Sequence, residues 1–191
     1  MASDPAHDPE PQAARNGVRV RLRPVGEDDG PRVVELFESL SPDSVFNRFL
    51  SPLARLDEER VRALTHLQPG IDYALAACID DGGLERFAGV GRFRRVTAEV
   101  AEIALVVGDP WHRLGVGRML LKGLTGIARD LGLRWFDSTI EPANVRLLRF
   151  AEACGFKGTL KYQNGLLNMR TDVESLFPAN PRDPIEDHPR P

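Results

Sequence analysis

The chain of 191 residues has few of the features that mark secreted, metal-binding or membrane proteins. Cys78 and Cys154 are too few and too far apart for a disulfide framework or a cysteine metal site, so we expect no bound metal. No segment approaches the roughly 20 apolar residues of a membrane span. The N-terminus also lacks the basic start and apolar run of a signal peptide. These absences predict a cytoplasmic protein that does not enter the membrane.

The central part of the chain also lacks an excess of basic residues. Residues 1–16 and 178–191 hold eight of the fifteen prolines and almost no large apolar side chains, so we expect two disordered tails. Without them, 22 basic and 22 acidic residues remain in a single domain over residues 17–177. Proteins that bind nucleic acid usually carry a basic excess or stripe, and the few Trp and Tyr residues offer little stacking surface. We therefore expect no nucleic-acid partner.

Hydrophobic periodicity predicts alternating strands and helices within this domain. Period-two patterns and turn signals predict strands at 18–25, 73–79, 86–96, 100–107, 134–140, 159–163 and 166–169. Helical spacing and capping residues predict helices near 28–40, from Pro42 onward, and near 57–67, 116–131 and 144–153. The order predicts an α/β (α+β) fold. It is a mixed, mostly antiparallel sheet of six or seven strands, with a central strand–loop–helix unit and helices on both faces.

The sequence GVGR occurs twice, at Gly89–Arg92 and at Gly115–Arg118. The first copy lies within an alternating strand pattern, where glycines typically permit a bulge or the close approach of a neighbour. The second copy lies between a strand and a helix. There the backbone N–H groups of residues 113–118 can converge on an anion at the helix N-terminus. We predict that the second copy binds a phosphate group and that the first is structural.

Two blocks around the second copy resemble a known family. AEIALVVGDPWHRLGVGRMLL at 101–121 and NVRLLRFAEACGF at 144–156 resemble the two cofactor-binding blocks of the GNAT superfamily of N-acetyltransferases. A third stretch, LSPDSVFNRFLSPLARLDEERVRALTHL at 40–67, is similar to GNAT domains of bacterial protein lysine acetyltransferases that silence acyl-CoA synthetases. The resemblance implies a GNAT-like domain with acetyl-CoA as co-substrate. It also implies an acyl-CoA synthetase as the protein partner.

The resemblance also implies a set of cofactor-binding residues. The pantetheine arm would lie along Leu105, Val106 and Val107, and the pyrophosphate would lie on Arg113, Leu114, Gly115, Val116, Gly117 and Arg118. His112, beside that loop, and Asn144, in the second block, would also contact the cofactor. Two of these positions leave questions. His112 stands where the family has Gln or Arg, and Asn144 is also suited to cap a helix.

Glu102 is the candidate catalytic residue. A free lysine has a pKa of ~10.4, so forming the neutral amine at pH 7 costs about 4.6 kcal/mol, and a carboxylate is the obvious base. Glu102 matches the family's glutamate and lies in a mostly apolar strand, where burial would make it a stronger base. The structural alternative is an exposed charge or an ion pair with Arg92 or Arg94.

The family's tyrosine acid has no counterpart at Phe150 or Ala151, so the thiolate leaves unassisted or Tyr73 or Tyr162 assists it. Cys154 could carry an acetyl group, although a buried packing role fits it better.

Three functions remain open from the sequence. The first is acetyl transfer from acetyl-CoA to a protein lysine by direct attack in a ternary complex. The second is acetylation of a small-molecule amine, and the third is non-catalytic acyl-CoA sensing. The sequence leaves monomer and homodimer open, and it leaves open whether Arg48 and Phe49 touch the acceptor or only shape its side of the site.

Overall fold

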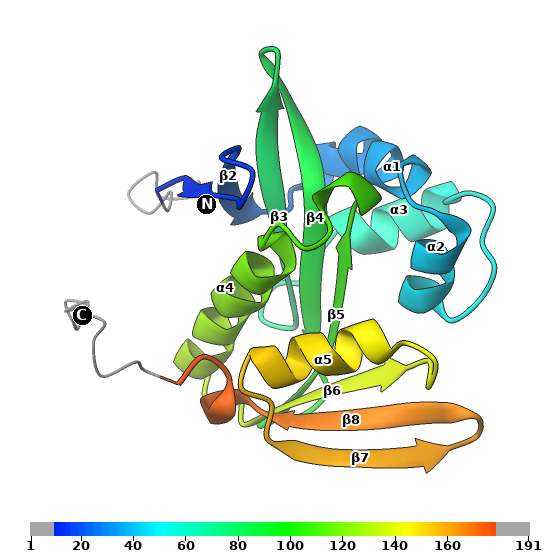
Figure 1. Ribbon diagram of the computed structural model, residues 1–191, viewed down its shortest axis with the longest axis vertical. Coiled ribbons are helices and arrows are strands. Elements are labelled where there is room, and N and C mark those ends of the chain that lie inside the picture. Colours follow the sequence, from blue (N-terminus) through cyan, green and yellow to red (C-terminus); the bar gives the residue numbers. More distant parts are fainter. Residues whose placement is uncertain (1–9, 179–191) are drawn as a thin grey trace.

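The computed structural model describes residues 10–178, which form one sheet with helices packed on it (Figure 1). The strands are β1 (Gln12–Ala13), β2 (Arg19–Pro24), β3 (Asp72–Asp81), β4 (Leu84–Arg95), β5 (Val100–Val107), β6 (Trp135–Ile140), β7 (Gly158–Gln163) and β8 (Leu166–Asp172). The α-helices are α1 (Gly30–Glu38), α2 (Pro42–Phe49), α3 (Glu58–Thr65), α4 (Val116–Asp130) and α5 (Val145–Ala153). Short 3-10 helices are η2 (Glu27–Asp29), η3 (Asp109–Trp111) and η4 (Val173–Ser175).

The strand order in the sheet is β1-β2-β3-β4-β5-β6-β8-β7. Every neighbouring pair is antiparallel except β5 and β6, which run parallel. The predicted fold class is therefore confirmed, including the central unit of β5, loop and α4. The described residues form eight strands rather than six or seven, because the sequence analysis missed β1.

Strands β5 and β6 pair only at their beginnings. Val100, Ala101 and Glu102 lie opposite Trp135, Phe136 and Asp137, and the pairing stops there. On its other edge, β5 stays paired with β4 as far as Val107. The sheet therefore opens into a gap beyond Glu102, between the second half of β5 and β6.

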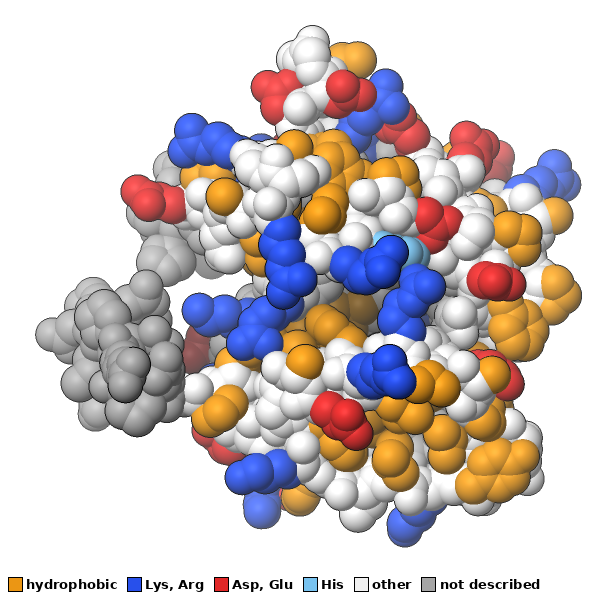
Figure 2. All heavy atoms as spheres, viewed as in Figure 1, with side chains coloured by type: hydrophobic (Ala, Val, Ile, Leu, Met, Phe, Trp, Pro, Cys, Tyr) orange, Lys and Arg blue, Asp and Glu red, His pale blue; other side chains and the backbone are white. Residues whose placement is uncertain are grey.

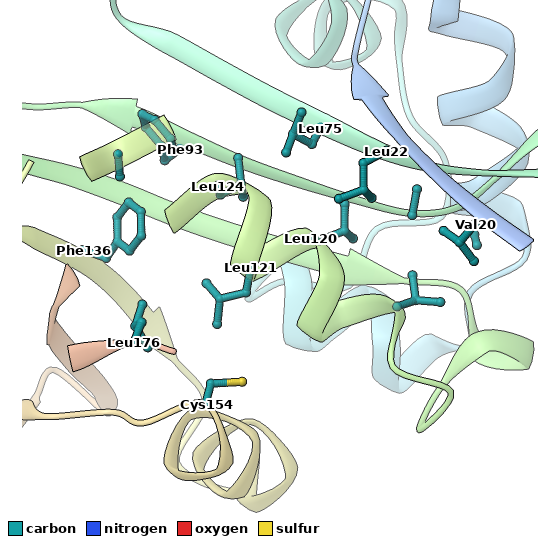
Figure 3. Close-up of a cluster of buried hydrophobic side chains, with 14 of the residues drawn as sticks. Val20, Leu22, Leu75, Phe93, Leu120, Leu121, Leu124, Phe136, Cys154 and Leu176 are labelled. Carbon is teal, nitrogen blue, oxygen red and sulfur yellow. The ribbon is translucent and has the colours of Figure 1, made fainter. Parts of the chain in front are cut away.

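The two faces of the sheet bury different helices. Leu120, Leu124 and Ala128 of α4 pack against one face, where Figure 3 shows Leu120 and Leu124 near Leu22 and Leu75. Val33 and Leu36 of α1 pack on the other face, with partly buried Leu64 of α3 beside them. Successive residues of β3 pack alternately against the α4 side and the α1 side, because side chains of a strand point to opposite faces in turn. Both faces of the central strands are thus buried, as predicted.

The first GVGR copy lies in β4, where its glycines allow close packing. A Cβ on Gly89 would lie 2.7 Å from the carbonyl oxygen of Val106, and one on Gly91 would lie 2.8 Å from a methyl group of Leu124. Any larger residue would push α4 or β5 away from β4. The structural role predicted for this copy agrees with these distances.

The N-terminal segment differs from the prediction. Residues 12–13 form β1, which pairs with β2, and Ala14 is buried in the main core. The backbone N–H of Arg15 donates to the carbonyl of Leu114 at 3.0 Å. The expected tail over residues 1–16 is therefore wrong for residues 12–15, because one small apolar residue anchors the segment. Residues 1–9 and 179–191 of the two expected tails lie outside the described part of the chain.

Candidate active site

The loop between β5 and α4 presents a row of unused backbone donors. Gly115 is the residue before the helix and has φ of 97°, and Arg113 has φ of 62°, so the chain turns sharply through left-handed conformations. Within residues 10–178, the backbone N–H groups of residues 113–118 donate to no protein acceptor. A Cβ on Gly115 would meet nothing within 4 Å, so the space beside this residue is open. Converging N–H groups at a helix N-terminus form an anion site.

The backbone of β5 offers a second set of polar groups. The N–H of Gly108 donates to Ala88 of β4, and the carbonyl of Val100 accepts from Val96 on the same side. The carbonyls of Glu99 and Val107 point the opposite way, toward β6 and His112 respectively. The direction of the backbone N–H and C=O groups alternates from one residue to the next along a strand. Those of Ile103, Leu105 and Val107 therefore face the gap, and those of Val106 face β4.

His112 connects β5 to α5. One ring nitrogen, Nε2, lies 2.9 Å from the carbonyl oxygen of Val107, and the guanidinium of Arg146 lies 3.0 Å from the other, Nδ1. Because an arginine can only donate, the contact with Arg146 requires Nδ1 to accept, which leaves Nε2 to donate to Val107. The backbone N–H of His112 is used as well, by the carbonyl of Asp109. The ring supports the loop, and a cofactor contact from His112 stays a prediction.

The side chains of Arg118 and Asn144 also have partners within the protein. Arg118 donates to the carbonyl of Ala153 at 3.0 Å and lies over the ring of Phe177, so it joins α4 to the end of α5. The side-chain oxygen of Asn144 accepts from the N–H of Leu147 at 3.0 Å and caps α5. Basic side chains nevertheless gather around a hollow on the face that carries α4 and α5 (Figure 2). Phosphate groups would meet positive charge there.

A cavity of about 640 Å³ lies at the other end of the gap, and Glu102 lines it. Glu102 is exposed, so its expected burial is wrong. The strand is apolar as predicted, but β6 leaves β5 at this residue and opens it to solvent. Arg94 lies opposite Glu102 in the register of β4, yet no ion pair joins Glu102 to Arg94 or Arg92 among the described residues. Both arginines contact Asp72 instead, at 3.0 and 3.4 Å.

A second carboxylate lines the cavity, but it is already bound. Asp137 lies opposite Glu102 in β6 and accepts two hydrogen bonds from Arg170, of 2.7 and 2.6 Å. The neighbouring residue Ser138 also lines the cavity, but its hydroxyl is buried and has no hydrogen-bond partner within the described residues. Nothing in the sequence singles out Asp137, Ser138 or Arg170, because only the gap between β5 and β6 gives them a shared cavity.

Helix α2 is held against the loop that follows β5. Asp109 accepts from the backbone N–H of Ser41 at 2.6 Å and from the Ser44 hydroxyl at 2.5 Å. Burial alone would raise the pKa of Asp109, but these hydrogen bonds outweigh it and hold the pKa below its ordinary value. The clamp fixes α2 and thereby places its last turn at the cavity.

Several candidate residues lie away from the site. Cys154 is buried in the core, where burial raises the pKa of its thiol, so it packs as a small apolar group. Tyr73 stacks on Phe93 with a centroid distance of 4.9 Å, and Tyr162 is exposed on β7. None of the three lines the cavity. Over residues 10–178 no three metal-ligating side chains come together, and no helix there is long and apolar enough to span a bilayer.

Comparison with known proteins adds independent evidence to this geometry. The family described as "Acetyltransferase (GNAT) domain" matches residues 19–157. The chain is 30% identical over 148 residues to an acetyltransferase of Pseudomonas aeruginosa, covering 75% of this chain and 77% of that protein. It is 27% identical over 151 residues to the acetyltransferase Pat of Mycolicibacterium smegmatis. That match covers 77% of this chain but spans only 44% of the length of Pat.

The fold also matches a solved structure along most of its length. The crystal structure of the GNAT domain of S. lividans PAT superimposes with a TM-score of 0.79 and 29% identity. The match covers 89% of this chain and 99% of that domain. The similarity therefore extends over the loop of unused donors, the gap and the cavity.

Proposed function

The chain belongs to the GNAT family of acetyltransferases, and we propose that it transfers an acetyl group from acetyl-CoA to a lysine side-chain amine of a protein. One observation carries this proposal. Glu102 is an exposed carboxylate with no ion-pair partner within residues 10–178, it lines a cavity, and it lies where β5 and β6 separate. A free carboxylate at that point is what deprotonation of an amine beside a thioester requires.

The residues of the gap suit the shape and charge of acetyl-CoA. The N–H groups of residues 113–118 would donate to the pyrophosphate, and the polar groups of Leu105 and Val107 would bond the amides of the pantetheine arm. The carbonyl of Val107 already accepts from His112, which leaves its N–H for this purpose. Acetyl-CoA would supply the activated acetyl group at the end of the gap near Glu102. Val106 would contact the cofactor through its side chain, because its backbone groups face β4. Asn144 would contact it through its side-chain N–H groups, because its side-chain oxygen caps α5.

Glu102 acts on the incoming lysine. It accepts a proton from the ammonium group and so offsets the cost of about 4.6 kcal/mol for forming the neutral amine at pH 7. The amine nitrogen then attacks the thioester carbon, the C–N bond forms, the C–S bond breaks and CoA leaves as its thiolate. The second proton of the nitrogen passes to that thiolate or to water as the amide forms.

A protein acceptor is favoured over a small amine by two resemblances. The stretch at 40–67 is similar to protein lysine acetyltransferases that silence acyl-CoA synthetases, and the fold matches the GNAT domain of S. lividans PAT. The cavity opens between α2 and the β7–β8 hairpin, as shown by Arg48 and Lys161 in its lining. This opening gives a long lysine side chain access from solvent. An acyl-CoA synthetase is accordingly the first acceptor to test.

The substitution Glu102→Gln tests the catalytic assignment. It removes the base but keeps the size of the side chain, so we expect turnover to fall by about 100-fold while the Kd for acetyl-CoA, measured by calorimetry, stays the same. Glu99→Gln is the matched control, because Glu99 precedes the same strand but does not line the cavity. A loss below tenfold in Glu102→Gln would refute Glu102 as the base. An equal loss in Asp137→Asn but not Glu102→Gln would move that role to Asp137.

The acceptor is tested separately with isotope-labelled acetyl-CoA. Acyl-CoA synthetases, free amino acids and polyamines are each incubated with the protein, and mass spectrometry locates the label. Label on a synthetase lysine is the expected result. Label only on small amines would overturn the protein acceptor, and tight acetyl-CoA binding without any labelled product would support the sensing function instead.

A further inference from the structure

The cavity that holds Glu102 contains more positive than negative charge. Five basic and two acidic side chains line it, namely Arg48, Arg92, Arg94, Lys161 and Arg170 against Glu102 and Asp137. A lysine acceptor is itself a cation before it reacts. A cavity made only for that amine would be expected to carry acidic side chains, so the basic lining needs another explanation.

Most of these basic groups have carboxylate partners within the protein. Arg170 is bound by Asp137 through two hydrogen bonds. Arg92 and Arg94 share one carboxylate, that of Asp72, which is buried behind them. Arg92 also donates to the carbonyl of Ala63 at 2.9 Å. Two arginines on one aspartate leave an excess positive charge on this wall of the cavity.

Arg48 has no carboxylate partner among the described residues. It lies in the last turn of α2, half-buried, with its guanidinium 5.0 Å from the ring of Phe49. Burial and the charge of Arg92 lower the pKa of Arg48 to about 10, so it keeps its charge at neutral pH. Removing a cation from water without a counter-charge is costly, and buried charges are normally paired. The missing partner of Arg48 is therefore expected to come from a bound molecule.

The position of Arg48 shows which bound molecule supplies that partner. Arg92 and Arg94 lie on the same face of the sheet as Glu102, which lies opposite Arg94 across β4 and β5. Arg48 faces the same cavity from α2, which Asp109 clamps in place. The phosphate-binding loop is at the other end of β5, beyond Val107. An anion at Arg48 thus belongs to the acceptor rather than to the phosphates of CoA.

We propose that the acceptor carries a carboxylate close to the amine that is acetylated, and that Arg48 binds this carboxylate with Arg92 beside it. This proposal rests on the amine acetylation proposed above, because it names the class of amine that is acetylated. The carboxylate is either an aspartate or glutamate side chain next to the acceptor lysine in a protein, or the α-carboxylate of a free amino acid. Either source gives Arg48 a planar anion that its guanidinium can bind through two hydrogen bonds.

The test uses pairs of acceptors that differ only in this charge. One pair is a lysine peptide with glutamates on both sides of the lysine and the same peptide with glutamines. The second pair is a free amino acid and its carboxamide. We expect the wild-type protein to use the charged member at least tenfold better in kcat/KM. Equal use of both members in each pair would overturn the proposal.

Substitutions then assign the preference to Arg48. Arg48→Met should reduce the preference below threefold by raising the KM for the charged acceptor, while kcat and the KM for acetyl-CoA stay unchanged. Arg48→Lys should keep part of the preference for the charged acceptor, because lysine retains the positive charge. Arg55→Met is the matched control, since Arg55 is exposed in the loop after α2 and does not line the cavity. A preference that survives Arg48→Met would refute the role of Arg48.

The two pairs also separate this proposal from the protein-lysine function. Acetylation of both peptides at equal rates, with no preference for the free amino acid over its carboxamide, would keep the lysine function and overturn the carboxylate. Acetylation of the free amino acid alone, lost in its carboxamide and in Arg48→Met, would overturn the protein acceptor and keep the carboxylate. If Arg48→Met does not fold, the wild-type ratios still decide between these results.

Discussion

At the α4 end of the gap the donors are backbone N–H groups, whereas the cavity at the other end is lined by charged side chains. The N–H groups of residues 113–118 depend on the path of the chain, so most substitutions there leave the donors in place. The cavity depends on which residue stands at 48, 72, 92 and 102. This difference fits our proposal that the loop binds a cofactor shared by the family, while the cavity selects the acceptor of this protein.

The largest effect is expected from Asp72→Asn, which tests whether the cavity and the loop of backbone donors behave independently. The Asp72 side chain is 5% exposed and is the carboxylate partner of both Arg92 and Arg94. Asp72→Asn leaves two neighbouring cations without that charge, so we expect it to lower the free energy of unfolding by ~3 kcal/mol. Denaturant unfolding measures this loss. The Kd for acetyl-CoA of the folded fraction should not change, and a loss of both together would show that the two ends are not independent.

Gly115 tests whether the loop works through its backbone path. In Gly115→Ala the new Cβ meets no protein atom, but the φ of 97° is strained for any residue other than glycine. We expect the Kd for acetyl-CoA, measured by calorimetry, to rise about tenfold, since a strain of ~1–2 kcal/mol would shift the loop.

Gly126→Ala is the control for Gly115→Ala. Gly126 lies within α4, and a Cβ there also meets nothing within 4 Å, but its backbone is not in the left-handed region. This substitution should raise stability by roughly 0.5–1 kcal/mol and leave the Kd unchanged. Equal weakening of acetyl-CoA binding by both substitutions would contradict a specific role for the path at Gly115.

The smallest effect is expected at His112. A glutamine can also donate to the carbonyl of Val107, and the backbone N–H groups of residues 113–118 do not involve this side chain. We therefore expect His112→Gln to change the Kd for acetyl-CoA by less than about threefold, because one neutral hydrogen bond replaces another. A change above tenfold would mean that the imidazole, or Arg146 bound to it, contacts the cofactor directly.

Local sequence pattern was sufficient to predict those features of the fold that depend on neighbouring residues. It distinguished the two GVGR copies, because one lies within an alternating strand and the other before a helix. The cap at Asn144 and the order of the strands and helices after residue 17 followed from the same kind of signal.

The features that were missed depend on contacts between distant segments. An apolar strand predicts a buried Glu102, but β6 leaves β5 at that residue and exposes it. Asp72 is close to Arg92 and Arg94 only because β3 pairs with β4. The lack of a carboxylate for Arg48 could not be seen from neighbouring letters, since it requires knowing what surrounds α2.

The hydrogen bond from Arg15 to Leu114 has a practical consequence for work with this family. The family match begins at residue 19, so a chain shortened to that boundary would appear complete. It would nevertheless lack β1, the buried Ala14 and the N–H group that donates to the carbonyl of Leu114 in the loop between β5 and α4. We expect such a truncated protein to bind acetyl-CoA more weakly, although the two sequence blocks at 101–121 and 144–156 would be intact. Affinity tags and fusion partners are best attached before residue 10.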